Sequence, residues 1–190
     1  NNSGRMSIWI SEFNGNFTQG TIVDGVDWGL GDDNPLGIVI TNACDLEHDH
    51  SGFLMVAALE PAAEVLGASK EFQSLVKDST DGLLKRRQWD ALTRFLKDYI
   101  HNKNICRHFF FDPRPVLDMD CVVVDFQHIR SLDLEQLKSL EPIGQMKHPF
   151  IEQMMMRFTS YVARIPVDRP DDEEEQKYIK ELAGIYTLKR

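Results

Sequence analysis

The sequence lacks what several large classes of protein require. Only three of its 190 residues are cysteines, and an odd, sparse set of this kind is not a disulfide framework. No apolar run approaches the roughly 18–20 residues that span a bilayer, and no charged-then-apolar signal segment opens the chain. Eight prolines and twelve glycines are too few for wholesale disorder. We therefore expect a folded cytoplasmic protein that does not enter the membrane.

Basic residues are scarce relative to acidic ones, and this affects which partners are expected. The formal net charge is −9, so the surface repels nucleic-acid phosphates unless the basic residues are segregated. The only basic run, at 85–87, is too short for a nucleic-acid arm. Much of the acid is local, in the run 168–175. Nucleic-acid binding is therefore disfavoured, and the expected partner is a protein.

Apolar patterning predicts strands at both ends of a helical middle. Apolar residues make up 42% of the chain, which is enough for a substantial core. Continuous β-branched runs such as 37–41 and 121–126 are typical of strands buried on both faces. Strands are predicted at 8–10, 20–23, 37–41, 53–59, 105–111 and 121–126. Helices are predicted at 61–76 with a break at Gly67, from a Thr80-Asp81 cap to Tyr99, and at 133–140, 148–165 and 176–183.

This order of elements does not alternate between strand and helix, and it predicts the α+β class. We expect a small, mostly antiparallel sheet or an SH3-like barrel, with a helical insertion at 60–102 and helices near the C-terminus. The runs 37–41 and 53–59, joined by a polar loop, suggest a hairpin. Met6 is taken as the natural start of one domain over 6–166. An acidic linker at 167–175 and a short helical tail at 176–190 would follow it.

Three segments near the start resemble the opening of PemK-type toxins. These are Gln19-Gly-Thr-Ile-Val23, Gly37-Ile-Val-Ile-Thr-Asn42 and Gly52-Phe-Leu-Met-Val-Ala57. The resemblance covers roughly 40 residues and implies an SH3-like barrel. The family has an Arg before the buried strand and a Ser or Thr after the next one. Here those places hold 34–36 (Asn-Pro-Leu) and 59–60 (Leu-Glu), so the resemblance implies the barrel and leaves the ribonuclease activity in doubt.

A second resemblance is more local. The segment Thr41-Asn-Ala-Cys-Asp45 is similar to a Thr-x-x-Cys-Asp signature found in uncharacterised bacterial and phage-encoded proteins. The segments Cys121-Val-Val-Val-Asp125 and 149–164 also resemble that group. The resemblance implies a bacterial or phage setting and no particular activity.

The densest group of reactive side chains follows the predicted strand at 37–41. Cys44, His48 and His50 could ligate zinc, the candidate cofactor, although no Cys-x-x-Cys or His-Glu-x-x-His spacing is present. Cys44 could instead be a nucleophile, with Asp45 beside it and His108 as the base, although nearby carboxylates disfavour a thiolate. The simplest alternative is that Cys44 packs as a small apolar group and the polar residues form a solvated turn.

Arginines supply candidate anion-binding groups elsewhere. Arg107 and His108 are neighbours on a predicted strand, so we expect them to point to opposite faces and at most one to face a site. Arg157 and Arg164 are seven residues apart on a predicted helix and would share a face, where they could bind a phosphate or carboxylate. They could equally pair with nearby acids.

No complete catalytic motif is present, and whether the protein is an enzyme stays open. The leading interpretation is a binding or regulatory module of a bacterial or phage conflict system, of the defence or toxin type, which contacts a protein partner. The alternatives are a metal- or thiol-dependent hydrolase centred on Cys44, Asp45 and His48, or a divergent PemK-like ribonuclease. Neither alternative comes with a substrate that the sequence identifies.

Overall fold

The computed structural model describes residues 7–29, 34–42, 53–77, 79, 82–103 and 107–163. Its strands are β1 (Ile10–Ser11), β2 (Thr21–Asp24), β3 (Gly37–Val39), β4 (Phe53–Pro61), β5 (His108–Phe111), β6 (Val122–Asp133) and β7 (Glu141–Met146). Its helices are α2 (Ala62–Ala68), α3 (Lys70–Val76), α4 (Arg86–Ile100), α5 (Leu134–Lys138) and α6 (Phe150–Val162). No helix in these ranges is long and apolar enough to cross a membrane.

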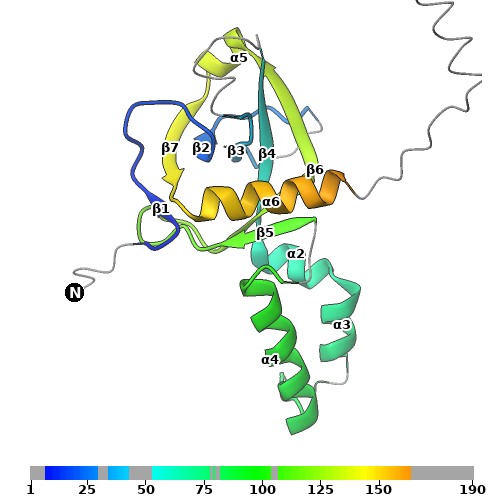
Figure 1. The fold of residues 1–190 in the computed structure, drawn as a ribbon. Helices are drawn as coiled ribbons and strands as arrows, with labels where there is room; N and C mark the ends of the chain where they lie inside the picture. The colour runs from blue at the N-terminus through cyan, green and yellow to red at the C-terminus, as the bar shows by residue number, and fades with distance from the viewer. Residues whose placement is uncertain are drawn as a thin grey trace, which may run out of the picture.

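The strands form one antiparallel sheet that curls into a half barrel, so the predicted α+β class is confirmed. The strand order is β1-β7-β2-β3-β4-β6-β5, with β1 and β5 at the two edges. The predicted hairpin is confirmed, because β3 pairs with β4 in antiparallel register. Helix α6 crosses one face of the sheet, whereas α2, α3 and α4 extend from the end of β4 as a separate helical layer (Figure 1).

Alternation along the strands gives the sheet two apolar faces. In β6, Val122 and Val124 belong to the large core beneath α6, whereas Val123 packs on the other face against α2 and α4. In β5, Phe109 joins the core beneath α6 and Phe110 joins the helical layer. Successive side chains of a strand point to opposite faces, so a run that is apolar throughout requires cover on both. This explains why the run at 121–126 lies between α6 and the helical layer, whereas the run at 37–41 packs beneath α6 on one face and in a separate apolar cluster around Val23 and Val56 on the other.

A bulge divides β6 into two parts. Ala57 of β4 pairs with Ile129, but the next residue, Ala58, pairs with Asp125, so the residues 126–128 have no partner on β4. The predicted strand stops at Phe126 because the apolar run stops there, whereas the observed strand continues beyond the bulge to Asp133. A bulge bends its strand and redirects the side chains within it. Both parts of β6 therefore pair with β4, but they meet it in different registers.

Strand β7 was not predicted, because its sequence has no β-branched run and contains a proline and a glycine. It lies between β1 and β2 and pairs with both. The register shifts between Ile22 and Val23, which pair with Gly144 and Pro142 respectively. Proline cannot donate a ladder hydrogen bond and is tolerated in a sheet at such an irregularity. Gln145 then ties the strands together, because its side chain accepts a hydrogen bond from the Thr21 hydroxyl at 2.8 Å.

The helical layer differs from the prediction at two boundaries. The first helix breaks at Ser69 and not at Gly67, because the Ser69 hydroxyl caps α3 by accepting a hydrogen bond from the backbone N–H of Phe72. The next helix begins at Arg86, after an N-cap at Lys85, and not at the predicted Thr80-Asp81 cap. The Gln88 side chain accepts a hydrogen bond from the backbone N–H of Lys85 and fixes this start.

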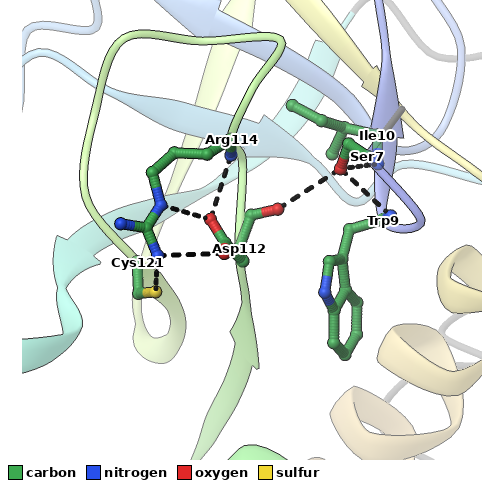
Figure 2. Close-up of polar contacts among 6 residues, drawn as sticks. All are labelled: Ser7, Trp9, Ile10, Asp112, Arg114 and Cys121. Carbon is green, nitrogen blue, oxygen red and sulfur yellow. Dashed lines mark hydrogen bonds and ion pairs between the residues drawn. The ribbon is translucent and has the colours of Figure 1, made fainter. Parts of the chain in front are cut away.

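Side chains connect the two edges of the half barrel. The Trp9 ring, next to β1, lies 6.5 Å from the Phe109 ring of β5 and 4.2 Å from the Phe150 ring of α6. The Ser7 hydroxyl donates to the backbone carbonyl of Asp112, just after β5 (Figure 2). The two edge strands therefore meet through an aromatic cluster and one polar contact.

Helix α6 carries the apolar stripe that its sequence predicts. Ile151 and Met154 are buried in the core, and Phe158 and Tyr161 pack at its margin beside Phe126. The helix is described as far as Val162, so the last predicted member of the stripe, Ile165, lies outside the described residues. The predicted helix at 176–183 lies outside them as well.

Candidate ligand-binding cleft

A cleft of about 640 Å³ lies between the sheet and the helical layer. The end of β4, the start of β5 and the bulged part of β6 form one side, and α2, α3 and α4 form the other. Its walls combine carboxylates, two histidines, an arginine and two aromatic rings. The lining residues are Glu60, Val65, Ala68, Ser69, Glu71, Phe95, Tyr99, Arg107, His108, Asp125 and His128.

Asp125 is the centre of the polar wall. Its carboxylate accepts two hydrogen bonds from the Arg107 guanidinium, at 2.8 and 2.6 Å, and a third from the backbone N–H of Gln127 at 2.9 Å. Burial on its own would raise the pKa of Asp125, but the bonds from Arg107 and Gln127 outweigh it and hold the pKa below its usual range. The same carboxylate thus holds Arg107 in place and stabilises the turn of the bulge.

His108 lies directly across the β5–β6 pair from Asp125. Its Nε2 is 3.9 Å from Asp125 Oδ1, which is beyond hydrogen-bonding distance, and its side chain is 15% exposed. Burial lowers the pKa of His108, Asp125 opposes that shift, and the charge of Arg107 adds to it. His108 is therefore neutral at neutral pH and can donate and accept one hydrogen bond each.

The bulge places a second histidine, His128, in the lining of the cleft. His128 Nδ1 lies 3.6 Å from Glu60 Oε1, and its ring lies 4.5 Å from the ring of Trp28. Trp28 is 7% exposed, and its indole Nε1 has no hydrogen-bond partner among the described residues. Glu60 and His128 thus sit at the rim, where a ligand can reach both.

Aromatic side chains of α4 provide the helical wall. Tyr99 is 4% exposed and packs edge-on against Phe110, with the ring centroids 5.9 Å apart. Its hydroxyl is buried and has no partner within the described part of the chain. Burial raises the pKa of Tyr99 to about 12, so the hydroxyl stays protonated. A buried hydroxyl without a partner is uncommon in native proteins and requires an explanation.

A smaller hollow of about 230 Å³ continues the cleft between α3 and α4. It shares Glu71, Phe95 and Tyr99 with the main cleft and adds the charged residues Arg94 and Asp98. Because the two hollows share three residues, one extended ligand could occupy both.

Another cavity, of about 550 Å³, lies beside the start of α6, but its polar groups are already bonded within the protein. Lys147 donates to the backbone carbonyl of Ser7, His148 contacts Glu152, and the Gln145 side chain bonds to Thr21 and to Gln19. The cleft is the stronger candidate because it contains a buried hydroxyl and carboxylates that are not neutralised by a guanidinium.

The structure places two of the predicted site residues together. Arg107 and His108 both line the cleft, so the expectation that at most one of them faces a site is wrong. The reason is that β5 begins at His108, and Arg107 precedes the strand and is not bound by its alternation. Arg107 is engaged by Asp125, and its side chain remains 47% exposed.

Of the other predicted site residues, the structure describes Arg157. Cys44, Asp45, His48 and His50, the predicted catalytic and metal residues, lie outside the described residues, as does Arg164. Arg157 is on α6 and does not line the cleft. The described residues before Cys44 end near the start of β4, where the Thr41 hydroxyl accepts a hydrogen bond from the backbone N–H of Met55. His108 lies near the other end of β4.

Cys121 is the free cysteine that the structure describes, and its setting does not favour a reactive thiol. Arg114 Nη2 lies 3.3 Å from its Sγ and also bonds to the carboxylate of Asp112 (Figure 2). Burial raises the pKa of the Cys121 thiol, and the charge of Asp112 adds to that effect. Across the described ranges, no three His, Cys, Asp or Glu side chains are placed to hold a metal ion.

Sequence reasoning missed Glu60, Tyr99, Asp125 and His128 as site residues. Asp125 offered a signal, since a carboxylate at the end of a four-residue apolar run requires a buried partner. Tyr99 was assigned to an apolar helix face, and nothing in the sequence shows that its hydroxyl lacks a partner. His128 enters the cleft through a bulge that the residue pattern does not predict.

Comparison with protein-family models and with curated proteins found no match to this chain.

Proposed function

We propose that the protein is a binding module that receives a segment of a protein partner in the cleft between the sheet and the helical layer. The observation that carries the proposal is the composition of this cleft, in which carboxylates and aromatic rings line a space of about 640 Å³. Clefts of this size with a few polar groups among apolar ones are typical binding sites. The resemblance to bacterial and phage-encoded proteins favours a role in a conflict system.

The polar groups of the cleft favour binding over catalysis. Asp125 already accepts three hydrogen bonds, and the Ser69 hydroxyl is used as a helix cap. His108 lies 3.9 Å from Asp125, too far for the hydrogen bond that orients a general base. Within the described lining, no hydroxyl or thiol is paired with a histidine. Asp125, Arg107 and Ser69 are therefore held by hydrogen bonds within the protein, which suits recognition better than proton transfer.

Photo-crosslinking tests this proposal directly. Benzoylphenylalanine would be placed at Ala68, an exposed residue that lines the cleft, and at Gln153, an exposed residue on α6, as the matched control. Irradiation in the cells that naturally produce the protein should give a discrete, larger protein adduct from position 68 and none from position 153. Adducts from position 153 alone, or from neither position, would contradict the proposal.

The hydrolase predicted from the sequence is a second candidate, and of its predicted catalytic residues the structure describes His108, which is neutral and lines the cleft. Its proposed centre, Cys44, Asp45 and His48, lies outside the described residues. Metal analysis of the purified protein and of Cys44→Ser and His48→Ala variants tests this candidate. About one zinc per chain, lost in both variants without unfolding, would favour a metal-dependent enzyme. A metal-free parent protein with an unreactive Cys44 would rule out both forms of the hydrolase.

A further inference from the structure

We infer that the segment bound in the cleft is an extended peptide with an arginine or lysine side chain, held by Glu60 and Glu71 against the rings of Phe95 and Tyr99. This inference rests on the proposed function and names the chemistry of the partner at the same site. It follows from charge, from aromatic surface and from one unpartnered hydroxyl.

Charge gives the first argument. The cleft and the adjoining hollow together contain four carboxylates (Glu60, Glu71, Asp98 and Asp125) but two guanidinium groups (Arg94 and Arg107). Asp125 and Arg107 neutralise each other through their two-bonded pair. The remaining side chains carry an excess of negative charge, and they include Glu60 on the sheet wall and Glu71 on the helical wall. A cation between these walls would gain attraction from both, and this attraction would be less screened by salt at the half-buried Glu60 than at the exposed Glu71.

The aromatic surface gives the second argument. The rings of Phe95 and Tyr99 are 6.4 Å apart on successive turns of α4, and Phe72 of α3 lies 6.4 Å from Phe95. Phe95 and Tyr99 line both hollows, and Phe95 is half-buried. Guanidinium and ammonium groups bind to aromatic faces, and arginine does so most often. Carboxylates beside aromatic rings therefore favour a basic side chain over a neutral or acidic one.

The Tyr99 hydroxyl gives the third, independent argument. It has no partner among the residues that the structure describes, and its side chain is almost fully buried. It lies on a residue shared by both hollows, so a ligand that spans them passes over this side chain. The hydroxyl oxygen is closed to solvent in the free protein, so a ligand reaches it when the Tyr99 side chain turns into the cleft, where the hydroxyl can donate to a carbonyl oxygen. A peptide has main-chain carbonyls, whereas an isolated amine or guanidinium has none, so the hydroxyl favours a peptide.

Nuclear magnetic resonance titration of the ¹⁵N-labelled full chain tests the inference. The probe is acetyl-Ala-Ala-Arg-Ala-Ala-amide, and its matched control has citrulline, an uncharged analogue of the same shape, in place of arginine. The arginine peptide should cause saturable shifts at α3, α4 and the end of β4, with a Kd at least fivefold lower than that of the citrulline peptide.

Three variants separate the contributions. A double Glu60→Gln, Glu71→Gln variant should weaken binding of the arginine peptide at least fivefold, whereas Glu12→Gln, at an exposed position away from the cleft, should change it less than twofold. Tyr99→Phe should weaken binding of the arginine peptide but leave binding of butylguanidinium unchanged. Equal binding of the two peptides, shifts confined to other surfaces, or no effect of the double variant would each overturn the inference.

The two proposals can fail separately. If crosslinks form at position 68 but the cleft does not prefer the arginine peptide, a protein partner binds there through other chemistry and the present inference is wrong. If the arginine peptide binds in the cleft but no protein crosslinks in cells, the charge preference is supported and the protein-partner function is contradicted.

Discussion

Removing the Tyr99 hydroxyl should stabilise the folded protein. The hydroxyl is buried with no partner in the described structure, so it loses its hydrogen bonds to water on folding and gains none within the protein. Leaving a buried polar group unsatisfied costs about 1–3 kcal/mol. Phenylalanine fills the same space apart from one oxygen, and the small void it leaves costs roughly 0.4 kcal/mol. Tyr99→Phe should therefore raise the free energy of unfolding by about 1 kcal/mol.

Urea denaturation at neutral pH measures this change. An unchanged m-value with a higher midpoint would show that native stability had changed. For a chain of this length the melting temperature should rise by roughly 2–4 °C. Burial raises the pKa of Tyr99 to about 12, so the phenol is neutral throughout such an experiment and ionisation does not contribute. Tyr161→Phe, on a half-buried tyrosine of α6, is the matched control.

One result would refute the reasoning. If Tyr99→Phe lowers stability by about 1 kcal/mol or more, the hydroxyl has a partner in the free protein, and the third argument for a peptide ligand is lost. If stability rises as expected while peptide affinity falls, the hydroxyl lowers stability and serves binding. Such an exchange of stability for function is common at binding sites.

Three further substitutions test other parts of the structure. Asp125→Asn weakens the pair with the neighbouring arginine and should cost about 2–3 kcal/mol in urea denaturation, whereas Asp90→Asn, in an exposed pair on α4, should cost less than about 0.5 kcal/mol. The pKa of His108 is lowered in the folded state, so the free energy of unfolding is unaffected by this group above the unfolded pKa near 6.5 and falls as the pH drops from that value towards the folded pKa. The slope in this range is at most about 1.4 kcal/mol per pH unit, and His108→Asn should flatten it. Gly20→Ala places a Cβ 2.9 Å from a side-chain carbon of α6 at a φ of +84° and should lower stability by about 2 kcal/mol, whereas Gly67→Ala, with open space around it, should raise stability by about 0.5 kcal/mol.

The parts of the fold that could be predicted are those whose sequence pattern matches their burial. The residues 38–39 and 122–124 are β-branched throughout, and their side chains are buried in apolar clusters on both faces of the sheet. Helix α6 has its apolar residues at helical spacing because one of its faces lies on the sheet. In these segments local propensity and the tertiary environment favour the same structure, so the sequence pattern is sufficient to predict it.

Strand β7 and the second half of β6 could not be predicted, because pairing and not composition makes them strands. Pro142 and Gly144 disfavour a strand locally, yet β7 has neighbours on both sides that accept its irregular register. Beyond the bulge of β6, the strand is polar and partly exposed, and its long partner β4 holds it in place. Tertiary pairing overrides weak local preference in both cases.

The candidate site was predicted only in part. The sequence indicated His108 and Arg107 but could not show that both meet Asp125, because that meeting depends on where β5 begins and on a bulge in β6. The cleft also requires α4 to turn Tyr99 towards the sheet, which helical spacing alone does not distinguish from ordinary core packing. Distances between elements, and not residue types, decide which groups form a site.

The position of β7 between β1 and β2 has a consequence for the order in which the protein can fold during its synthesis. Ile10 pairs with Met146 and Thr21 pairs with Gln145, so β1 and β2, which leave the ribosome before the other described strands, have a gap between them that is filled by β7, the last of the described strands to be made. Until then, β1 has no partner in the described sheet, and the aromatic cluster around Trp9 lacks Phe150. Such distant pairing slows folding and leaves strand edges exposed to other chains. We therefore expect the nascent protein to be vulnerable to aggregation until residues 141–146 emerge.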